Sequence, residues 1–195
     1  MVIILGITGA TGVIYGIRLL EVLSTMNDVE THLIISEVGE VTIKCETERS
    51  IKEIKKLATY AYDIKDLGAR ISSGSFQRDA MIIAPCTVKT MSALANSYNE
   101  NLIIRAGDVT LKERKKLILA IRETPLHLGH LRSMEQLTQM GAVIMPPVPA
   151  FYHRPENIQD IVDHTVGKML DMVGIQHNLF HRWSGCTMED KLVNE

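Results

Sequence analysis

A glycine-rich turn follows the first apolar segment of the chain. Residues 2–5 read VIIL, and residues 6–12 directly after them read GITGATG. Glycines let backbone N–H groups approach a ligand closely, and the helix after such a turn points its positive end at that ligand. We therefore expect an anionic group, most simply a phosphate, at this turn. The spacing is not G-x-G-x-x-G, and the second strand ends at Ser36 rather than at an acidic residue, which favours a mononucleotide over a dinucleotide.

A second set of polar side chains follows the apolar run at residues 81–84. Thr87, Lys89 and Thr90 offer two hydroxyls and a charge where the next helix should begin, and ligands of open α/β sheets bind at such strand ends. The alternative is that Thr87 or Thr90 simply caps the helix. Cys86 in the same stretch is interpreted as a small core residue rather than as a nucleophile.

A charged pair, Arg122 and Glu123, follows the apolar run at residues 117–121. A charge beside a buried strand is costly unless it has a partner. The guanidinium would suit a phosphate or the electron-rich edge of a flavin ring, and the carboxylate could act as a general acid or base. A structural salt bridge is the alternative for this pair.

Metal binding is disfavoured by the spacing of its usual ligands. His127 and His130 are three residues apart and His177 and His181 are four apart, but neither pair has a third ligand at recognisable spacing. The three cysteines form no C-x-x-C pair. We therefore expect neither a metal site nor structural disulfides, and a reducing cytoplasm fits best.

The composition is that of a globular chain. Of its 195 residues, 46% are hydrophobic and 23% charged, and the formal net charge is −2. These values argue against disorder and against a general nucleic-acid binder, which would need a basic excess. Aromatic residues, at 5%, are too few for base-stacking platforms. No apolar run approaches the roughly 18 residues that a membrane span needs.

The candidate residues lie on alternating strand-like and helix-like segments. Strands are predicted at residues 2–7, 32–36, 81–84, 117–121 and 142–146, and helices at 12–25, 89–97, 131–140 and 157–173. The strand-like runs are continuously apolar, as a parallel sheet covered on both faces requires. The alternation predicts an α/β fold, a Rossmann-like (flavodoxin-like) doubly wound parallel sheet in a single domain.

Three remaining stretches carry charge or lose periodicity. Residues 46–65 mix lysines and glutamates at helical spacing and predict a solvated surface helix, and the basic cluster at 112–116 predicts an exposed helix end. Periodicity is lost from residue 175 onward. We therefore expect a ligand-binding domain over residues 1–175 and a C-terminal tail over 176–195, which contains Trp183.

Six blocks of sequence occur together in a fixed order. They are TGATG at residues 8–12, ISSGSF at 71–76, PCTVKT at 85–90, RAGDVTLKER at 105–114, RETPL at 122–126, and GAVIMPP through FYHRP at 141–155. Together, and with Arg182 and Trp183 near the end, they resemble the flavin prenyltransferases of the UbiX type nearly end to end. The commoner turn in that family reads Gly-Ala-Ser-Gly, and Thr11 here keeps the hydroxyl of that serine but adds a methyl group.

The resemblance implies a set of site residues. For FMN, it implies that Gly9, Ala10 and Thr11 hold the phosphate region, with Ser36, Thr87, Val88, Lys89, Thr90 and Arg122 completing the flavin site. For the allyl phosphate, it implies Tyr152 and Lys168, with Arg105 and Lys112 as contacts from a neighbouring subunit. Glu123, Glu46, Lys112 and Trp183 match active-site positions. We expect Glu123 to transfer a proton and Glu46 to assist, while Trp183 belongs to the active site or to a subunit interface.

The resemblance also implies a reaction and an assembly. Reduced FMN would accept a dimethylallyl group from dimethylallyl monophosphate at N5 and C6, and the prenylated FMN would serve a UbiD-type decarboxylase of ubiquinone synthesis or of aromatic-acid breakdown. Because no DDxxD motif occurs, we expect a metal-independent prenyltransferase in which preorganised charges stabilise the leaving phosphate. The implied assembly is a cytoplasmic homododecamer with active sites at subunit interfaces and with neither nucleic-acid nor membrane partners.

Two alternatives remain open. One is an FMN-dependent decarboxylase of the cysteine type from the same superfamily, although those enzymes carry PASANT where this chain has PCTVKT, and a PxMNxxMW segment that is absent here. The other is a non-catalytic FMN carrier or accessory subunit. Retention of Lys112, Glu123, Tyr152 and Lys168 speaks against a carrier, since holding FMN alone needs no second phosphate site.

Overall fold

Six parallel strands form one sheet in the computed structural model, which describes residues 1–183 and 185. The strands are β1 (Val2–Ile7), β2 (Glu30–Ile35), β3 (Tyr60–Tyr62), β4 (Ala80–Cys86), β5 (Lys116–Ile121) and β6 (Val143–Ile144). Their order is β3-β2-β1-β4-β5-β6, the strand order of Rossmann folds. The central strands β1 and β4 are buried along almost their whole length, because helices cover both faces of the sheet.

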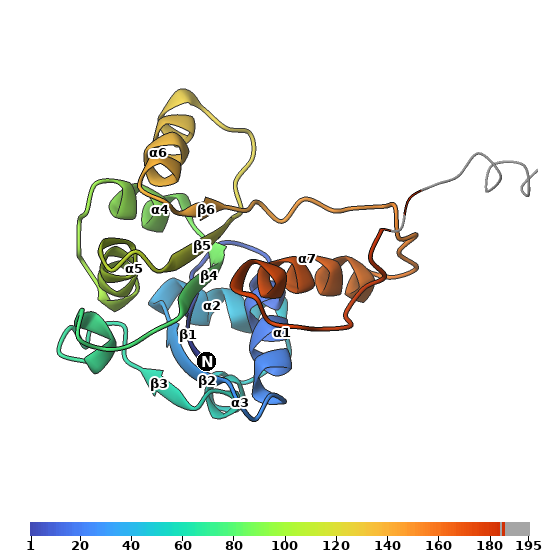
Figure 1. The fold of residues 1–195 in the computed structure, drawn as a ribbon, viewed down its shortest axis with the longest axis horizontal. Coiled ribbons are helices and arrows are strands. Elements are labelled where there is room, and N and C mark those ends of the chain that lie inside the picture. Colours follow the sequence, from blue (N-terminus) through green and yellow to red (C-terminus); the bar gives the residue numbers. More distant parts are fainter. Residues whose placement is uncertain (184, 186–195) are drawn as a thin grey trace, which may run out of the picture.

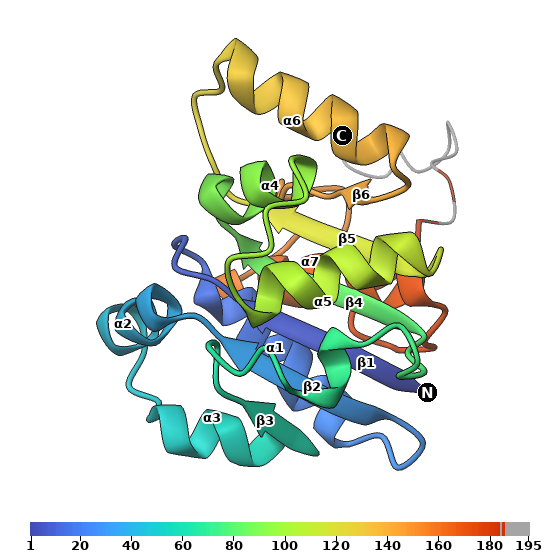
Figure 2. The ribbon, with the colours of Figure 1, turned by 90° about the vertical axis from the view of Figure 1, so that its left-hand side faces the viewer.

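The helices lie in two layers, one on each face of the sheet (Figures 1 and 2). One layer contains α1 (Val13–Ser24), α2 (Glu37–Glu46), α3 (Ile51–Leu57) and α7 (Ile158–Val173); the other contains α4 (Val88–Ala95), α5 (Leu102–Lys112), α6 (Leu128–Gln139) and a short 3₁₀ helix (Arg70–Ser72). The helix after β1 and the helix after β4 therefore lie on opposite faces. In sheets of this kind ligands bind at such a switch point, outside the carboxyl ends of the strands.

The predicted fold class is confirmed, and all five predicted strands are present: β1 has the predicted bounds, and the other four have shifted ends. The surface helix predicted over residues 46–65 is confirmed only in part: α3, in which only Ile54 is buried, lies within this stretch, but α2 ends at Glu46 and β3 follows α3. Ser50 starts α3 through a reciprocal cap: its Oγ accepts the Glu53 N–H at 3.2 Å, and Glu53 Oε2 accepts the Ser50 N–H at 2.9 Å. The basic cluster is an exposed helix end as predicted, since α5 ends at Lys112.

Two glycines shape the turn between β1 and α1. Gly12 precedes the helix with φ of 90°, a left-handed conformation that glycine adopts without steric penalty. A Cβ atom at Gly16 would lie 2.1 Å from the carbonyl oxygen of Ala84. The absence of a side chain therefore lets α1 pack directly against β4, and this contact brings the turn after β1 next to the turn after β4.

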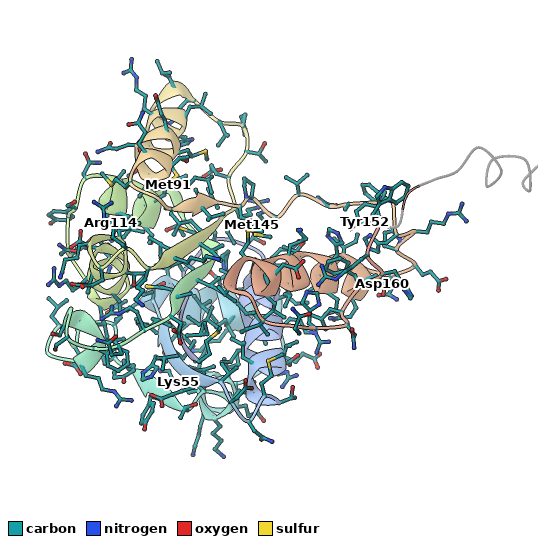
Figure 3. All side chains as sticks on the ribbon, viewed as in Figure 1. Lys55, Met91, Arg114, Met145, Tyr152 and Asp160 are labelled. Carbon is teal, nitrogen blue, oxygen red and sulfur yellow. The ribbon has the colours of Figure 1, made fainter. Side chains whose placement is uncertain are left out.

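An extended segment links the sheet to the last helix. Residues 145–157, called the arm below, run from β6 to the outer end of α7 (Figure 1). Tyr152 lies at the outer end of the arm, near Asp160 in the first turn of α7 (Figure 3). Asn157 and Asp160 cap that helix reciprocally. The arm therefore holds its side chains away from the sheet and beside the start of α7.

The chain after α7 folds back along that helix. Ile175 is buried in the same core as α1 and α7. Arg182 donates hydrogen bonds of 3.0 and 2.6 Å to the two carboxylate oxygens of Asp171. This return brings Trp183 to the arm. The described part of the predicted tail thus packs on the domain, and residues 184 and 186–195 lie outside the described residues.

Candidate active site

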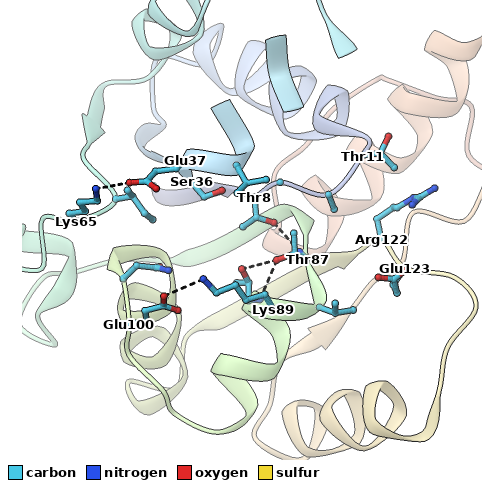
Figure 4. Close-up of a pocket in the computed structure, with 17 residues that line it drawn as sticks. Thr8, Thr11, Ser36, Glu37, Lys65, Thr87, Lys89, Glu100, Arg122 and Glu123 are labelled. Carbon is cyan, nitrogen blue, oxygen red and sulfur yellow. Dashed lines mark hydrogen bonds and ion pairs between the residues drawn. The ribbon is translucent and has the colours of Figure 1, made fainter. Parts of the chain in front are cut away.

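A cavity of about 660 Å³ opens at the switch point of the sheet (Figure 4). Its walls are the turns after β1, β2, β4 and β5 and the segments before α5 and after β3. The lining residues are Thr8, Gly9, Ala10, Thr11, Ser36, Glu37, Val38, Ile64, Lys65, Thr87, Val88, Lys89, Thr90, Glu100, Asn101, Arg122 and Glu123. All nine residues predicted to hold FMN are in this set, together with Glu123. The structure therefore brings together residues that lie more than a hundred positions apart in the sequence.

One buried hydroxyl joins the two central turns of the cavity. Thr8 is 2% exposed, and its Oγ1 donates a hydrogen bond of 2.7 Å to the carbonyl oxygen of Pro85. The same oxygen accepts the backbone N–H of Thr87 at 2.9 Å. The end of β1 is thereby held in register with the start of α4. Thr8 belongs to the TGATG motif at residues 8–12, but no feature of the sequence indicates that its hydroxyl joins these two turns.

Two helices begin at the cavity and point their positive ends towards it. Ser36 caps α2 by accepting the Gly39 N–H at 3.0 Å, and Thr87 caps α4 by accepting the Thr90 N–H at 3.2 Å. The capping alternative for Thr87 is therefore confirmed, and the same residue also lines the cavity. Helix N-termini attract anions. This part of the cavity thus favours a phosphate.

The start of α1 already has an anionic partner. Glu46, the last residue of α2, accepts the backbone N–H groups of Gly12 at 2.9 Å and Val13 at 3.2 Å through Oε2. Glu46 does not line the cavity. The N–H groups of Gly12 and Val13 therefore have a carboxylate partner within the chain, which offsets the positive end of the α1 dipole.

Two ion pairs lie at one end of the cavity (Figure 4). Glu37 pairs with Lys65 at 2.6 Å, and Lys89 pairs with Glu100 at 3.2 Å. The neighbouring carboxylate of Glu37 raises the pKa of Lys65, so this lysine is charged at neutral pH. Sequence reasoning identified Lys89 but missed the other three. Glu37 follows the predicted Ser36 directly, which was the available signal for it.

The opposite end of the cavity contains Thr11, Arg122 and Glu123 (Figure 4). The backbone N–H of Arg122 donates to the carbonyl oxygen of Cys86 at 3.2 Å, which fixes the residue at the end of β5. Glu123 Oε1 accepts the N–H of Thr124 at 3.0 Å. Within the described residues neither side chain forms an ion pair, so the salt-bridge alternative is wrong for this part of the chain. The guanidinium and the carboxylate remain available to a ligand.

Tyr152, Lys168 and Trp183 gather in a cluster that does not line the cavity. The hydroxyl of Tyr152 lies 2.8 Å from His164 Nε2, and the Trp183 ring packs edge-on against Tyr152 with ring centroids 5.7 Å apart. Lys168 lies one helical turn after His164, on the same face of α7, and its Nζ is 3.8 Å from Asp171 Oδ2. The two residues predicted for the allyl phosphate, Tyr152 and Lys168, and the predicted active-site residue Trp183 are therefore neighbours.

Arg105 and Lys112 lie along α5, whose first turn begins at the cavity. Arg105 donates from Nε to the carbonyl oxygen of Ser72 at 3.1 Å and pairs with Asp108 at 3.2 Å. Lys112 pairs with Glu113 at the far end of the helix. Asn101 lines the cavity, and 11 helical residues follow it, a rise of about 16 Å. One chain alone therefore keeps Lys112 away from its own cavity.

Cys86 lies next to the cavity without lining it. It is fully buried, and burial raises the pKa of its thiol, so the thiolate needed for nucleophilic attack is disfavoured. The interpretation of Cys86 as a core residue is confirmed. Among the described residues we find no group of three or more His, Cys, Asp or Glu side chains placed to bind a metal ion. None of the helices described here combines the length and apolarity that crossing a membrane requires.

Comparison with known proteins gives the same assignment over almost the whole chain. The Flavoprotein family matches residues 1–184. The flavin prenyltransferase UbiX of Thauera aromatica is 56% identical over 185 residues, which cover 95% of this chain and 95% of the relative. The flavin prenyltransferase UbiX of Escherichia coli (strain K12) is 52% identical over 185 residues, which cover 94% of this chain and 98% of the relative.

Some solved structures resemble the chain in both sequence and fold, and others resemble it in fold alone. The crystal structure of AnUbiX (PadA1) in complex with FMN and dimethylallyl pyrophosphate has a TM-score of 0.93 and 46% identity over 95% of this chain and 98% of that one. A dodecameric FMN-dependent UbiX-like decarboxylase from Escherichia coli O157:H7 has a TM-score of 0.93 and 45% identity, and the match covers 95% of this chain and 100% of that one. The peptidyl-cysteine decarboxylase EpiD, with a TM-score of 0.60 and 16% identity, shares the fold alone. The chain belongs to the UbiX-type family of flavin prenyltransferases.

Proposed function

We propose that the chain is a flavin prenyltransferase, which joins a dimethylallyl group from dimethylallyl monophosphate to N5 and C6 of reduced FMN and releases prenylated FMN. The observation that carries this proposal is the cavity at the switch point, whose lining contains all nine residues expected to hold FMN and also Glu123. Membership of the flavin prenyltransferase family supports the same reaction.

The cavity suits FMN in size and polarity. Its volume of about 660 Å³ lies within the range of roughly 300–1,000 Å³ typical of cofactor sites. We assign the phosphate to the end where α2 and α4 begin, near Lys65 and Lys89, since Glu46 already occupies the N–H groups at the start of α1. The flavin ring then lies towards Arg122 and Glu123. In this assignment the turn at residues 9–11 borders the ring rather than the phosphate.

We propose that the allyl phosphate binds where side chains of neighbouring subunits meet. Tyr152 and Lys168 lie in one cluster, Arg105 and Lys112 lie along α5, and none of them lines the cavity of its own chain. A homo-oligomer, in our proposal a dodecamer, brings these groups together at each cavity. A dodecameric relative with the same fold supports such an assembly.

The proposed chemistry requires no metal. Bound reduced FMN supplies the nucleophilic ring atoms. Lys112, Arg105, Lys168 and the hydroxyl of Tyr152 stabilise the charge that develops on the departing phosphate. Glu123, which lines the cavity without an ion pair among the described residues, transfers the proton. Trp183 provides an apolar wall for the allyl group, and Glu46 assists by holding the turn at Gly12.

We further propose a UbiD-type decarboxylase as the consumer of the product and the cytoplasm as the location. The first is what the resemblance to UbiX-type enzymes implies for the use of prenylated FMN. The second is supported by Cys45 and Cys86, which are both free thiols.

The decisive experiment is an anaerobic incubation of the purified protein with reduced FMN and dimethylallyl monophosphate, without added metal, followed by mass spectrometry of the released flavin. We expect a gain of one isoprene unit. A parallel reaction with the diphosphate tests the donor, because AnUbiX (PadA1) is known in complex with that form. Unmodified FMN would refute the prenyltransferase and favour a flavin carrier.

Glu123→Gln tests the proton transfer in the same assay. The amide keeps the size of the side chain but cannot exchange a proton at neutral pH, so we expect FMN to remain bound while most turnover is lost. Unchanged turnover would remove Glu123 from the mechanism.

A further inference from the structure

Two stacked imidazoles, those of the buried His164 and of the half-buried His153, lie behind Tyr152. His164, on α7, is 8% exposed, and its Nε2 lies 2.8 Å from the Tyr152 hydroxyl oxygen. The ring of His153, from the arm, stacks on His164 with centroids 4.8 Å apart and an interplanar angle of 6°. Both ring nitrogens of His153 are buried and have no hydrogen-bond partner among the described residues. Phe180, from the chain after α7, also packs against His164 at 4.6 Å.

The surroundings of His164 disfavour a charge on its ring. Burial lowers the pKa of His164, and the neighbouring His153 and Lys168 lower it further, against the opposite effect of Asp171. Titratable and charged groups lie near His164 on three segments: Tyr152 and His153 on the arm, Lys168 and Asp171 on α7, and His177 and Arg182, which bind Asp171, on the following segment. The helix α1 also packs on α7, where Arg18 pairs with Asp163. His164 is therefore neutral at neutral pH and carries a single ring N–H.

The position of that hydrogen decides what Tyr152 can do. Tyr152 has one hydroxyl hydrogen. If His164 Nε2 accepts it, no hydrogen remains for a ligand. If the imidazole hydrogen lies on Nε2, His164 donates to the Tyr152 oxygen, and the hydroxyl hydrogen points outward. An ionised phosphate oxygen can only accept, so a bound phosphate in that form selects the second arrangement, in which the two hydrogen bonds strengthen each other.

We propose that His164 is a positioning residue for the allyl donor: its Nε2–H donates to the hydroxyl oxygen of Tyr152 and so directs the hydroxyl hydrogen at the donor phosphate. This inference rests on the proposed function, which assigns Tyr152 and Lys168 to that phosphate. Because Lys168 lies one turn after His164 on the same face of α7, the helix holds the lysine and the oriented hydroxyl as a single anion-binding unit.

This arrangement predicts that the affinity for the allyl donor depends on pH. A protonated His164 also donates to Tyr152, and it adds a positive charge beside Lys168. Donor affinity therefore rises as the pH falls through the pKa of His164, and the bound phosphate raises that pKa in return. A variant without a titratable group at position 164 lacks this contribution, while the ionisation of the donor itself affects both proteins equally.

The test measures binding of dimethylallyl monophosphate to the holoenzyme with oxidised FMN by isothermal titration calorimetry, so that no reaction occurs. His164→Phe keeps a ring but cannot donate, and His164→Gln retains a donor as the matched control. We expect the Phe variant to bind the donor about 5- to 10-fold more weakly and the Gln variant to remain within about threefold of the parent, the range of one hydrogen bond. FMN affinity should be equal in all proteins.

A double-variant cycle separates positioning from a general structural role. In a Tyr152→Phe background, His164→Phe should cause no further loss of donor affinity. A loss as large as in the parent would overturn the inference, as would equal donor affinity in the parent and the Phe variant, or a parent holoenzyme that does not bind the donor. Donor binding with the expected cycle, but no prenylated flavin under reducing conditions, would refute the proposed function and support the His164 assignment.

Discussion

Among the described residues, the hydroxyl of Thr8 forms the single side-chain hydrogen-bonded link between the two central turns of the cavity, and Thr8→Val removes it. Thr8 is buried, donates to the Pro85 carbonyl at 2.7 Å and accepts the Thr87 N–H at 2.9 Å. Valine keeps the branched shape of threonine, so the substitution changes the hydrogen bonds without opening a cavity in the core.

The magnitude follows from what each partner loses. The N–H of Thr87, which is part-buried at the cavity wall, is left without its acceptor, which costs about 1–2 kcal/mol. The Pro85 carbonyl oxygen still accepts the backbone N–H of Thr8 at 3.2 Å, so its loss is smaller, about 0.5–1 kcal/mol. We expect the free energy of unfolding to fall by about 1.5–3 kcal/mol. FMN affinity should fall too, because Thr87 lines the cavity.

Urea denaturation at one fixed protein concentration measures this effect, since assembly makes stability concentration-dependent. Thr8→Ser is the matched control, because serine keeps the hydroxyl and loses only a methyl group. A Thr8→Val protein as stable as the parent would refute the reasoning. A serine variant as unstable as the valine variant would show that the packing of the methyl group, and not the hydroxyl, holds the two turns together.

Three further outcomes concern the packing of the central sheet. Gly16→Ala places a methyl carbon against the Ala84 carbonyl oxygen, and we expect a loss of about 1–3 kcal/mol in the same assay; parent-like stability would mean that α1 can shift freely. His32 is fully buried, and burial lowers its pKa below 6.5. As the pH falls below 6.5, the imidazole at position 32 therefore takes up a proton in the unfolded chain before it does so in the folded one. The free energy of unfolding should then decline by up to about 1.4 kcal/mol per pH unit. The decline should be smaller in His32→Gln, and Tm measured against pH follows it in both proteins. Iodoacetamide should modify Cys45 and spare Cys86 in the native protein, because Cys45 is exposed whereas burial raises the pKa of the Cys86 thiol; equal rates by peptide mass spectrometry would contradict that burial.

The fold class could be predicted because parallel strands that are buried on both faces read as continuous apolar runs. The two helices that the prediction missed, α2 and α5, both contain a glycine that lowers helix propensity. A Cβ at Gly39 would lie 2.8 Å from the Ile7 carbonyl oxygen, and one at Gly107 would lie 2.7 Å from the Leu94 side chain. Both glycines serve contacts with distant parts of the chain, which local patterns do not encode.

Those residues of the candidate site that directly follow strands could be predicted, because the topology of a parallel sheet fixes where strand ends lie. Ser36, Thr87 and Arg122 follow strands, and the carboxyl ends of parallel strands meet at one edge of the sheet. Lys65 and Glu100 also line the cavity, but they come from connecting segments whose positions depend on how distant elements pack.

The burial of Arg78 could not be predicted from the sequence. It is 2% exposed, and its guanidinium donates to backbone carbonyl oxygens, among them that of Ile71 at 3.0 Å. A single arginine between polar residues is usually exposed. Its burial depends on the loop that wraps around it, and that loop forms only in the folded protein.

The pairing of β1 with β4 has a consequence for synthesis on the ribosome. Ile3 of β1 pairs with Ala80 of β4, so a further 77 residues must be synthesised before the second neighbour of β1 begins to form. Until β4 has been made, β1 can pair with β2 on one side only, and its other edge is exposed to wrong partners. The cavity has walls from both sides of this junction. A flavin therefore cannot assist the folding of β1–β3 alone, and it can bind only those molecules in which these strands have already joined β4 and β5.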